Sequence, residues 1–305
     1  KNMYYQTMTK LDVEERLKKD DVIIIPVGST ENHGAAGPIG EDTFMVTRIA
    51  EMVAEKTGCT VAEPFWYGSH PFHHIGQPCT IPLPDSVFID MLRAVITGFW
   101  NTGFRKQIFI SLHGQEYSLP VALQEWGKKY QVPAMLYFVD IPRVMGQTLM
   151  DKAHGGPYDR PFQHACEAEQ SLSLALFPEL CQQDKAENTD TKGFLPAGHV
   201  DRGGDIYGYP IPGHCQVGNC GIECVTFPEG VLGHAKDADP KKAVASIEKT
   251  CDYLVKLHDD ILKAFPAGQL PPAELMSQRD PEEIEKLLKG PLKGGKHIYT
   301  LGWPT

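Results

Sequence analysis

The sequence of 305 residues lacks the hallmarks of several protein classes. It has no run of about 18 apolar residues, so no transmembrane helix is expected, and its first residues show no signal-peptide core. It also has no glycine-rich phosphate loop of the G-x-x-x-x-G-K-[ST] or G-x-G-x-x-G type, so nucleotide binding has no support. Internal repeats and low-complexity tracts are missing as well. Because neither a transmembrane helix nor a signal peptide is expected, we expect a cytoplasmic protein.

Basic residues are in deficit. The formal net charge is −10, with 29 Lys and Arg against 39 Asp and Glu. Proteins that bind nucleic acids carry clustered Lys and Arg, and the one basic stretch here, residues 286–296, is more simply a solvated helix and tail. We expect a small-molecule partner, and neither nucleic acid nor membrane.

The cysteines also lack the C-x₂-C spacing of common structural zinc sites. Eight are present, and three of them, Cys215, Cys220 and Cys224, follow His214 closely. In a chain of this size without a secretion signal, free thiols are the favoured interpretation, and a zinc knuckle is the alternative.

The sequence does contain the apolar residues needed for a hydrophobic core. Hydrophobic residues make up 42% of the chain, and compact apolar runs rich in β-formers alternate with helical patterns. Strands are expected at residues 22–27, 60–64, 107–112 and 134–139. Helices are expected at residues 43–56, 86–102, 119–130 and 240–265. This alternation predicts an α/β fold with three α/β/α layers and a mostly parallel central sheet.

We expect residues 1–265 to form one domain, because the candidate ligands described next are scattered along it and must meet in one fold. Residues 266–305 are expected to be a C-terminal extension, an arm that packs on the domain or on a neighbouring subunit.

Potential metal donors follow two of the predicted strands. Glu31, His33 and Asp42 come after the first apolar run, and His113 comes directly after residues 107–112. Ligands of open α/β sheets bind at the carboxyl edge of the strands, and carboxylate and imidazole groups bind Zn²⁺, Mn²⁺ or Fe²⁺. The alternative for the acids is a solvated loop position or, for Asp42, a helix N-cap.

A third segment, QHACEAEQS at 163–171, leads into an apolar run that predicts a helix beginning near Glu167. On a helix Glu167 and Glu169 lie about 200° apart, so only one of them can point into a site.

Together the three segments resemble the creatininase (creatinine amidohydrolase) family. Its pattern is G-x-x-E-x-H-G, then an Asp, then N-G-H-G-G-N, then H-A-G-E-x-E-T-S. Here these appear as GSTENHG at 28–34, Asp42, SLHGQE at 111–116 and HACEAEQS at 164–171. The resemblance covers roughly residues 10–265.

The resemblance implies a creatininase-like fold, two divalent metal ions (Zn²⁺, Mn²⁺ or Fe²⁺) and a homo-oligomer, since family members are often hexamers. Transferred by motif, Asp42 bridges the ions, Glu31 and His113 hold one, and His33 and Glu169 hold the other. Five donors for two ions leave room for a water whose pKa is lowered from ~15.7 toward ~7.

The chain departs from the family where the substrate would bind. In creatininases proper a Tyr and a Glu follow the central His and a Trp lies shortly before the later His, whereas here the positions are Gly114, Gln115 and Arg160. We expect a pocket that hydrogen-bonds several oxygens, which suits a polyhydroxylated substrate. Its candidate substrate-binding residues are His73, His74, Gln115 and Arg160.

The loop that carries His70, His73 and His74 follows the predicted strand at 60–64 and should lie near the same sheet edge. Ordinary loop histidines are the alternative.

Within the family the chain resembles the ring-opening hydrolases of inositol catabolism, which cleave a diketo-inositol such as 3-dehydro-scyllo-inosose. The N-terminal YYQTMT, residues 67–74 and residues 265–271 carry this likeness. A metal-activated water would add to a ring carbonyl, and His164 or Glu116 would carry the proton to the expelled enolate. The alternatives are a cyclic amide or lactam amidohydrolase of creatinine or formamide type, or a non-catalytic relative that binds metal or a polyol.

Overall fold

The computed structural model describes residues 3–190, 194–196, 199 and 227–298. Its centre is a four-stranded sheet in the order β2-β1-β3-β4, and every pairing is parallel. The strands are β1 (Val22–Pro26), β2 (Thr60–Val61), β3 (Lys106–Ser111) and β4 (Met135–Asp140). The described α-helices are α1 (Lys10–Leu17), α2 (Glu41–Thr57), α3 (Asp85–Thr102), α4 (Leu119–Tyr130), α5 (Ile141–Met145), α6 (Glu167–Leu176), α8 (Pro240–Ala264) and α9 (Pro281–Lys289).

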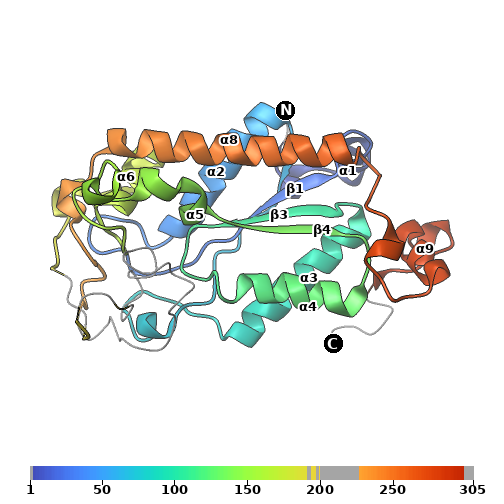
Figure 1. Ribbon diagram of the computed structural model, residues 1–305, viewed down its shortest axis with the longest axis horizontal. Helices are drawn as coiled ribbons and strands as arrows, with labels where there is room; N and C mark the ends of the chain where they lie inside the picture. Colours follow the sequence, from blue (N-terminus) through green and yellow to red (C-terminus); the bar gives the residue numbers. More distant parts are fainter. Residues whose placement is uncertain (1–2, 191–193, 197–198, 200–226, 299–305) are drawn as a thin grey trace.

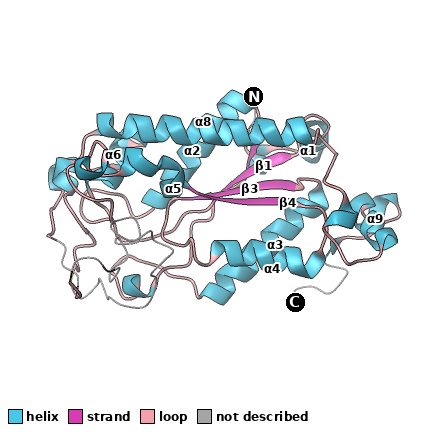
Figure 2. Ribbon diagram, in the orientation of Figure 1, coloured by secondary structure: helices cyan, strands magenta, loops and turns pink. Residues whose placement is uncertain are grey.

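Helices cover both faces of the sheet (Figures 1 and 2). Successive residues of β1 point to opposite faces, as in any strand. Val22 and Ile24 pack into one apolar cluster with α2, α6 and α8, and Ile23 and Ile25 into a second cluster with α3 and α4. All five residues of β1 are buried. The predicted three-layer α/β/α class is confirmed.

Most element boundaries lie within one residue of the predicted ones, and two elements differ by more. Strand β2 is shorter than predicted because Pro64, which has no N–H to donate to the ladder, lies within the predicted span. Helix α2 begins earlier, at Glu41, and Gly40 takes its N-cap position. Asp42 is therefore not the N-cap; it lies in the first helical turn, where the amide dipoles favour a negative charge.

A buried lysine secures the amino-terminal edge of the sheet. Lys106 is fully buried at the start of β3, and its Nζ lies 2.8 Å from Asp21 Oδ1. The same ammonium group donates to the carbonyl oxygens of Phe265 and Pro266, at 2.6 and 3.1 Å. These bonds tie the end of α8 to the sheet at the edge opposite the loops described below.

The segment after α8 contacts the body of the chain. Leu287 of α9 and Ile298 are buried in the cluster that contains Trp100 and Phe104. Arg105 also donates a 2.7 Å hydrogen bond to the carbonyl of Leu288. The division at residue 265 and any contact with a neighbouring subunit stay predictions.

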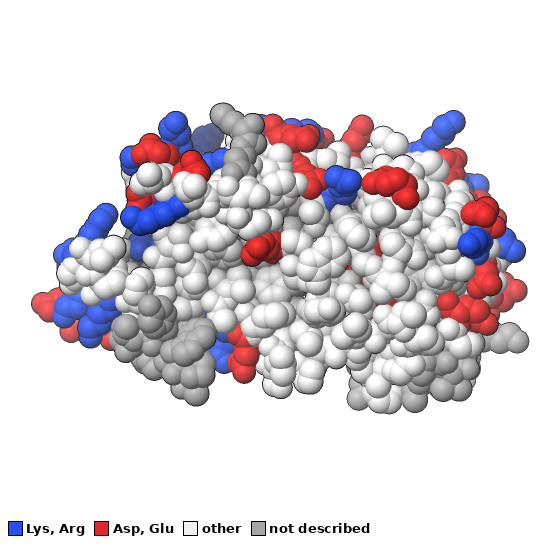
Figure 3. Space-filling view, turned by 180° about the vertical axis from the view of Figure 1, so that it is seen from behind, with Lys and Arg blue, Asp and Glu red and all other residues white. Residues whose placement is uncertain are grey.

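Charges of both signs are intermixed over the face in Figure 3, chiefly toward its ends and its upper margin. Within the described residues no helix has the length and apolar character needed to cross a membrane. The predicted choice between free thiols and a zinc knuckle at His214, Cys215, Cys220 and Cys224 lies outside the described residues.

Candidate metal centre

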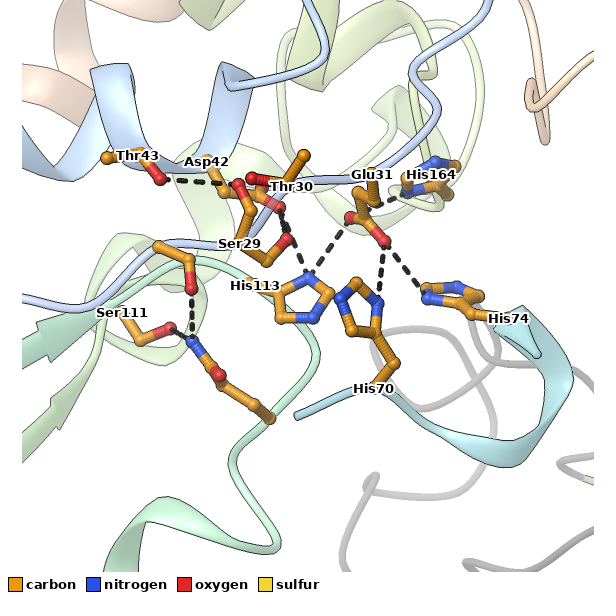
Figure 4. A network of polar contacts seen from close by, with 12 residues as sticks. Ser29, Thr30, Glu31, Asp42, Thr43, His70, His74, Ser111, His113 and His164 are labelled. Atoms are coloured by element: carbon orange, nitrogen blue, oxygen red, sulfur yellow. Dashed lines mark hydrogen bonds and ion pairs between the residues drawn. The ribbon is translucent and has the colours of Figure 1, made fainter. Parts of the chain in front are cut away.

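The loops after β1 and β3 leave the sheet at the same edge, because the two strands are parallel neighbours with Pro26 opposite Ile110. Glu31 lies on the first loop and His113 on the second. Their side chains meet, with His113 Nδ1 3.0 Å from Glu31 Oε1, although they are 82 residues apart in the sequence (Figure 4). Both are buried, with 3% and 4% of their surfaces exposed.

Helix α2 brings a second carboxylate to this edge. Gly28 lets the helix approach the end of β1 closely, because a Cβ atom there would lie 2.1 Å from Thr43 Oγ1. The two oxygens of Asp42 face different histidines: Oδ2 lies 3.2 Å from His113 Nδ1, and Oδ1 lies 3.7 Å from His33 Nε2. The Asp42 carboxylate therefore stands between two imidazole rings.

Backbone carbonyl groups orient both rings. His33 Nδ1 lies 3.2 Å from the carbonyl oxygen of Glu31, and His113 Nε2 lies 2.9 Å from that of Ser69. A carbonyl oxygen only accepts, so these ring nitrogens carry the protons. In each neutral ring the lone pair is then on the nitrogen that faces the carboxylates, as ligand histidines require.

The first turn of α6 supplies a further carboxylate. Glu169 is buried, its Oε2 lies 3.9 Å from His33 Nε2, and it accepts a hydrogen bond from the N–H of Ala165. Glu167 points elsewhere, because its carboxylate binds Lys242 Nζ at 2.5 Å. Of the two helix acids, the structure brings Glu169 to the cluster.

Two groups of donors correspond to the two predicted ion positions. Within each group the potential ligand atoms all lie within 4.8 Å of one another. The groups are Glu31, Asp42 and His113, and His33, Asp42 and Glu169. Two further groups meet the same criterion, namely Glu31, His70 and His74, and Glu31, His33 and His164.

The donors fit a divalent cation. Within the described part of the chain, His33 Nε2 and Asp42 Oδ1 are buried and have no hydrogen-bond partner. Leaving such an atom unsatisfied costs about 1–3 kcal/mol, and more for a charged group. Both atoms belong to one donor group, so a bound ion would satisfy them together. Carboxylate and imidazole donors suit Zn²⁺, Mn²⁺ and Fe²⁺.

The ionisation of the cluster indicates excess negative charge. Burial alone lowers the pKa of His33, but the charges of Glu41, Asp42 and Glu169 outweigh it and raise that pKa to about 10. Burial, opposed by His33, raises the pKa of Glu169 to about 8 and that of Glu41 to about 7. The cluster therefore retains protons that bound cations would displace.

His164 reaches the same cluster from the residues before α6. Its Nε2 donates a 2.6 Å hydrogen bond to the carbonyl of Asn32, so its Nδ1 carries the lone pair, 3.6 Å from Glu31 Oε1. Burial lowers the pKa of His164 to about 4, with the charge of Glu31 opposing the shift. The ring is therefore neutral near pH ~7.

Gln115 and Glu116 follow the central histidine but face different surroundings. The Gln115 amide donates to the carbonyl oxygens of Val27 and Gly28 and to the hydroxyl of Ser111, at 3.3, 3.2 and 3.0 Å. Those bonds hold the ends of β1 and β3 together, and the predicted contact of Gln115 with substrate stays a prediction. Burial raises the pKa of Glu116, with the charge of His113 opposing it.

The other three predicted substrate-binding residues lie in different surroundings. His74 is buried and its Nδ1 lies 3.1 Å from Glu31 Oε2. Its neighbour His73 is half-buried in the same short helical turn. Arg160 is exposed and lines a surface hollow with Asp190 and His234, so the structure does not place it with the donors.

Sequence reasoning assigned no role to Glu41, and it placed His70 near this sheet edge without assigning it to the cluster. Glu41 is completely buried, and its charge acts on both His33 and Glu169. Its position directly before Asp42 was the only signal. His70 is buried with its Nδ1 3.4 Å from Glu31 Oε2, and its signal was its place in the loop after the predicted strand at 60–64.

A parallel sheet with groups of carboxylates and histidines at its carboxyl edge defines the class, an α/β protein with a cluster of metal donors. Comparison with known proteins supplies the family. The creatininase family model, described as creatinine amidohydrolase, matches residues 6–258. The chain therefore belongs to the creatininase family, and the predicted resemblance is confirmed.

Individual relatives support the same assignment. The 3-dehydro-scyllo-inosose hydrolase of Thermotoga maritima is 54% identical over 301 residues, which cover 98% of this chain and 97% of that protein. The creatinine amidohydrolase of Pseudomonas putida is 25% identical over 218 residues, 64% of this chain and 80% of that protein. Both names denote hydrolases, in agreement with the predicted enzyme class.

The fold has relatives of known structure. The solved structure "Creatininase Mn" superposes with a TM-score of 0.65 at 20% identity, covering 89% of this chain and all of that chain (100%). The likeness confirms the predicted creatininase-like fold.

Proposed function

We propose that this chain is a divalent-metal-dependent hydrolase that opens a small cyclic polar substrate, with 3-dehydro-scyllo-inosose preferred. The observation that carries the proposal is the placement of Asp42, whose two oxygens face His113 and His33 in separate donor groups. The name and high identity of the Thermotoga maritima relative support the choice of substrate.

The proposed ligands follow the donor groups. Glu31, Asp42 and His113 would hold one ion, and His33, Asp42 and Glu169 the second, with Asp42 common to both. A pair of such ions polarises a carbonyl group and activates a water molecule. We propose Zn²⁺, Mn²⁺ or Fe²⁺, because such ligands accept all three and availability selects among them.

The chain itself must move one proton. Water addition to one carbonyl of a β-diketone, followed by carbon–carbon cleavage, leaves a carboxylic acid and an enolate carbon that takes up the proton lost by the water. His164 Nδ1 can accept that proton, because the ring is neutral and its Nε2–H is held by Asn32. We propose that it then protonates the enolate carbon, with Glu116 as the second candidate.

A cyclic amide is the second candidate substrate. It is supported by the description of the matched family model and by the Pseudomonas putida relative. The same proton on His164 would then pass to the leaving nitrogen. A non-catalytic member that binds metal or a polyol is the third candidate, and it predicts no turnover of any of these compounds.

The deciding experiment compares ring opening of 3-dehydro-scyllo-inosose, creatinine and a cyclic formamide by the protein loaded with Mn²⁺ or Zn²⁺. We expect turnover of the diketo-inositol. Turnover of creatinine alone would refute the substrate assignment, and no turnover with either ion would support the non-catalytic alternative.

Two variants test the residue roles. Asp42→Ala should lose both ions, as measured by elemental analysis, because each donor group loses its shared ligand. His164→Ala should retain both ions and lose about 10²–10⁴-fold in kcat. His154→Ala is the matched control, a partly exposed histidine that pairs with Asp151 and should leave metal content and kcat unchanged. Two retained ions in Asp42→Ala would contradict the shared ligand.

Three further expectations stay predictions: a homo-oligomer with six subunits, a location in the cytoplasm, and a role for residues 266–305 in subunit contacts. Sedimentation analysis of the purified protein tests the first.

A further inference from the structure

The carboxylate of Glu31 faces two separate sets of histidines. Its Oε1 lies 3.0 Å from His113 Nδ1 and 3.6 Å from His164 Nδ1. Its Oε2 points the other way, 3.1 Å from His74 Nδ1 and 3.4 Å from His70 Nδ1 (Figure 4). The proposed pair of ions uses the first side of this carboxylate and leaves the second side to His70 and His74.

These two histidines come from a part of the chain that supplies no ligand to the proposed pair. They lie between β2 and α3, and His74 ends the short 3₁₀ turn Phe72–His74. The ligand atoms of His70, His74 and Glu31 all lie within 4.8 Å of one another, and all three residues are buried. Two imidazoles and one carboxylate are also the protein ligands of many zinc sites that keep an open position.

His70 needs a partner that the described residues do not supply. Its side chain has no exposed surface (0%), and neither ring nitrogen has a hydrogen-bond partner among the described residues. Glu31 Oε2 lies 3.4 Å from Nδ1, which is longer than the usual range of about 2.7–3.2 Å for an N–H···O hydrogen bond. Orienting Glu31 would involve Nδ1 alone and would leave the buried Nε2 without a partner among the described residues.

We propose that His70, His74 and Glu31 Oε2 form a third divalent-cation site beside the proposed pair. Glu31 then joins the two sites, with one oxygen on each side. Imidazole-rich ligand sets favour Zn²⁺, Fe²⁺, Ni²⁺ or Cu²⁺ over Mg²⁺ and Ca²⁺, so the ion belongs to the first group. Such an ion would fix the segment between β2 and α3 onto the loop after β1.

The test counts ions. The purified protein is stripped with a chelator, dialysed against graded concentrations of free Zn²⁺, and analysed for zinc per chain. We expect three ions per chain in the wild type and two in His70→Ala/His74→Ala. The matched control is His73→Ala, which alters the same helical turn and should retain three ions. Far-UV circular dichroism confirms that each variant is folded.

A more conservative variant keeps the test decisive if the double variant does not fold. His70→Gln keeps a polar side chain of similar size and should weaken only the third ion, at least about tenfold in Kd, since it removes one of three ligands. Cobalt loading gives a second readout. The visible absorption of the third Co²⁺ should disappear in the double variant and should need at least about tenfold more free Co²⁺ in His70→Gln.

The outcomes separate this site from the proposed function. Two ions in both the wild type and the double variant would overturn the third site and leave the pair intact. Three ions in both would place the third ion elsewhere and also overturn it. A wild type that binds one ion, which the double variant loses and Asp42→Ala retains, would support the His70 site and refute the pair.

Discussion

A substitution of Ser29 tests the role of Asp42 without changing any of the proposed metal ligands. The serine side chain is buried in the loop after β1, and its hydroxyl donates a 2.6 Å hydrogen bond to Asp42 Oδ2. Ser29→Ala removes this bond without adding volume. Partners that orient metal ligands typically contribute about 10–100-fold to metal affinity, which corresponds to about 1.4–2.7 kcal/mol. We expect weaker binding of two ions, not loss of either.

The measurement is competition for Zn²⁺ against a chromophoric chelator, with wild type and variant side by side. Ser246→Ala is the matched control, because Ser246 is equally buried and its hydroxyl donates a 3.0 Å hydrogen bond to Thr148 in another part of the fold. The control should bind zinc like the wild type. Equal affinities for Ser29→Ala and the wild type would refute the role of Asp42 as an oriented, shared ligand.

The remaining predictions concern stability. Lys106→Met should lower the free energy of unfolding by about 3–5 kcal/mol, because Asp21 then stays buried without its cation. Urea denaturation measures this, and adding Asp21→Leu should restore much of the loss; a double variant no more stable than the single one would contradict the explanation. For His258, burial lowers the pKa, but the hydrogen bonds to Asp20 and Asp259 outweigh it and raise the pKa. A histidine whose pKa is raised in the folded state stabilises the fold fully at pH values below its unfolded-state pKa, which is near ~6.5. This contribution is lost as the pH rises through the folded-state pKa. The melting temperatures of wild type and His258→Gln should therefore differ more at about pH 6 than at about pH 9, and a constant difference would argue against the His258 pairing.

Sequence patterns were sufficient for the elements of the fold. Strand β1 is buried on both faces and is an apolar run throughout, and β3 is buried throughout with the apolar residues Ile108, Phe109 and Ile110 at its centre. Both runs can be recognised without any knowledge of their neighbours. The alternation with helices then required a parallel sheet. The motif segments could also be recognised, since Glu31 lies on the loop after the first run and His113 follows shortly after the second.

Sequence patterns could not decide the direction of individual side chains. Gln115 lies two residues after His113, and the packing of β1 against β3 turns its Nε2 to the backbone of Val27 and Gly28. Arg160 lines a surface hollow with Asp190 and His234. A polar residue type suits the predicted chemistry at both positions, and its place in the sequence alone does not decide where the side chain points.

The sequence by itself determined the core, the parallel order of the chain and the segments that carry the donors, because hydrophobic period and strand ends are local properties. Only the tertiary structure decided that Glu169 and not Glu167 reaches His33, that Glu41 is buried beside them, and that His70 shares a carboxylate with His113. The physical reason is that donor groups form between segments far apart in the chain, and their distances depend on how helices and loops pack over the edge of the sheet.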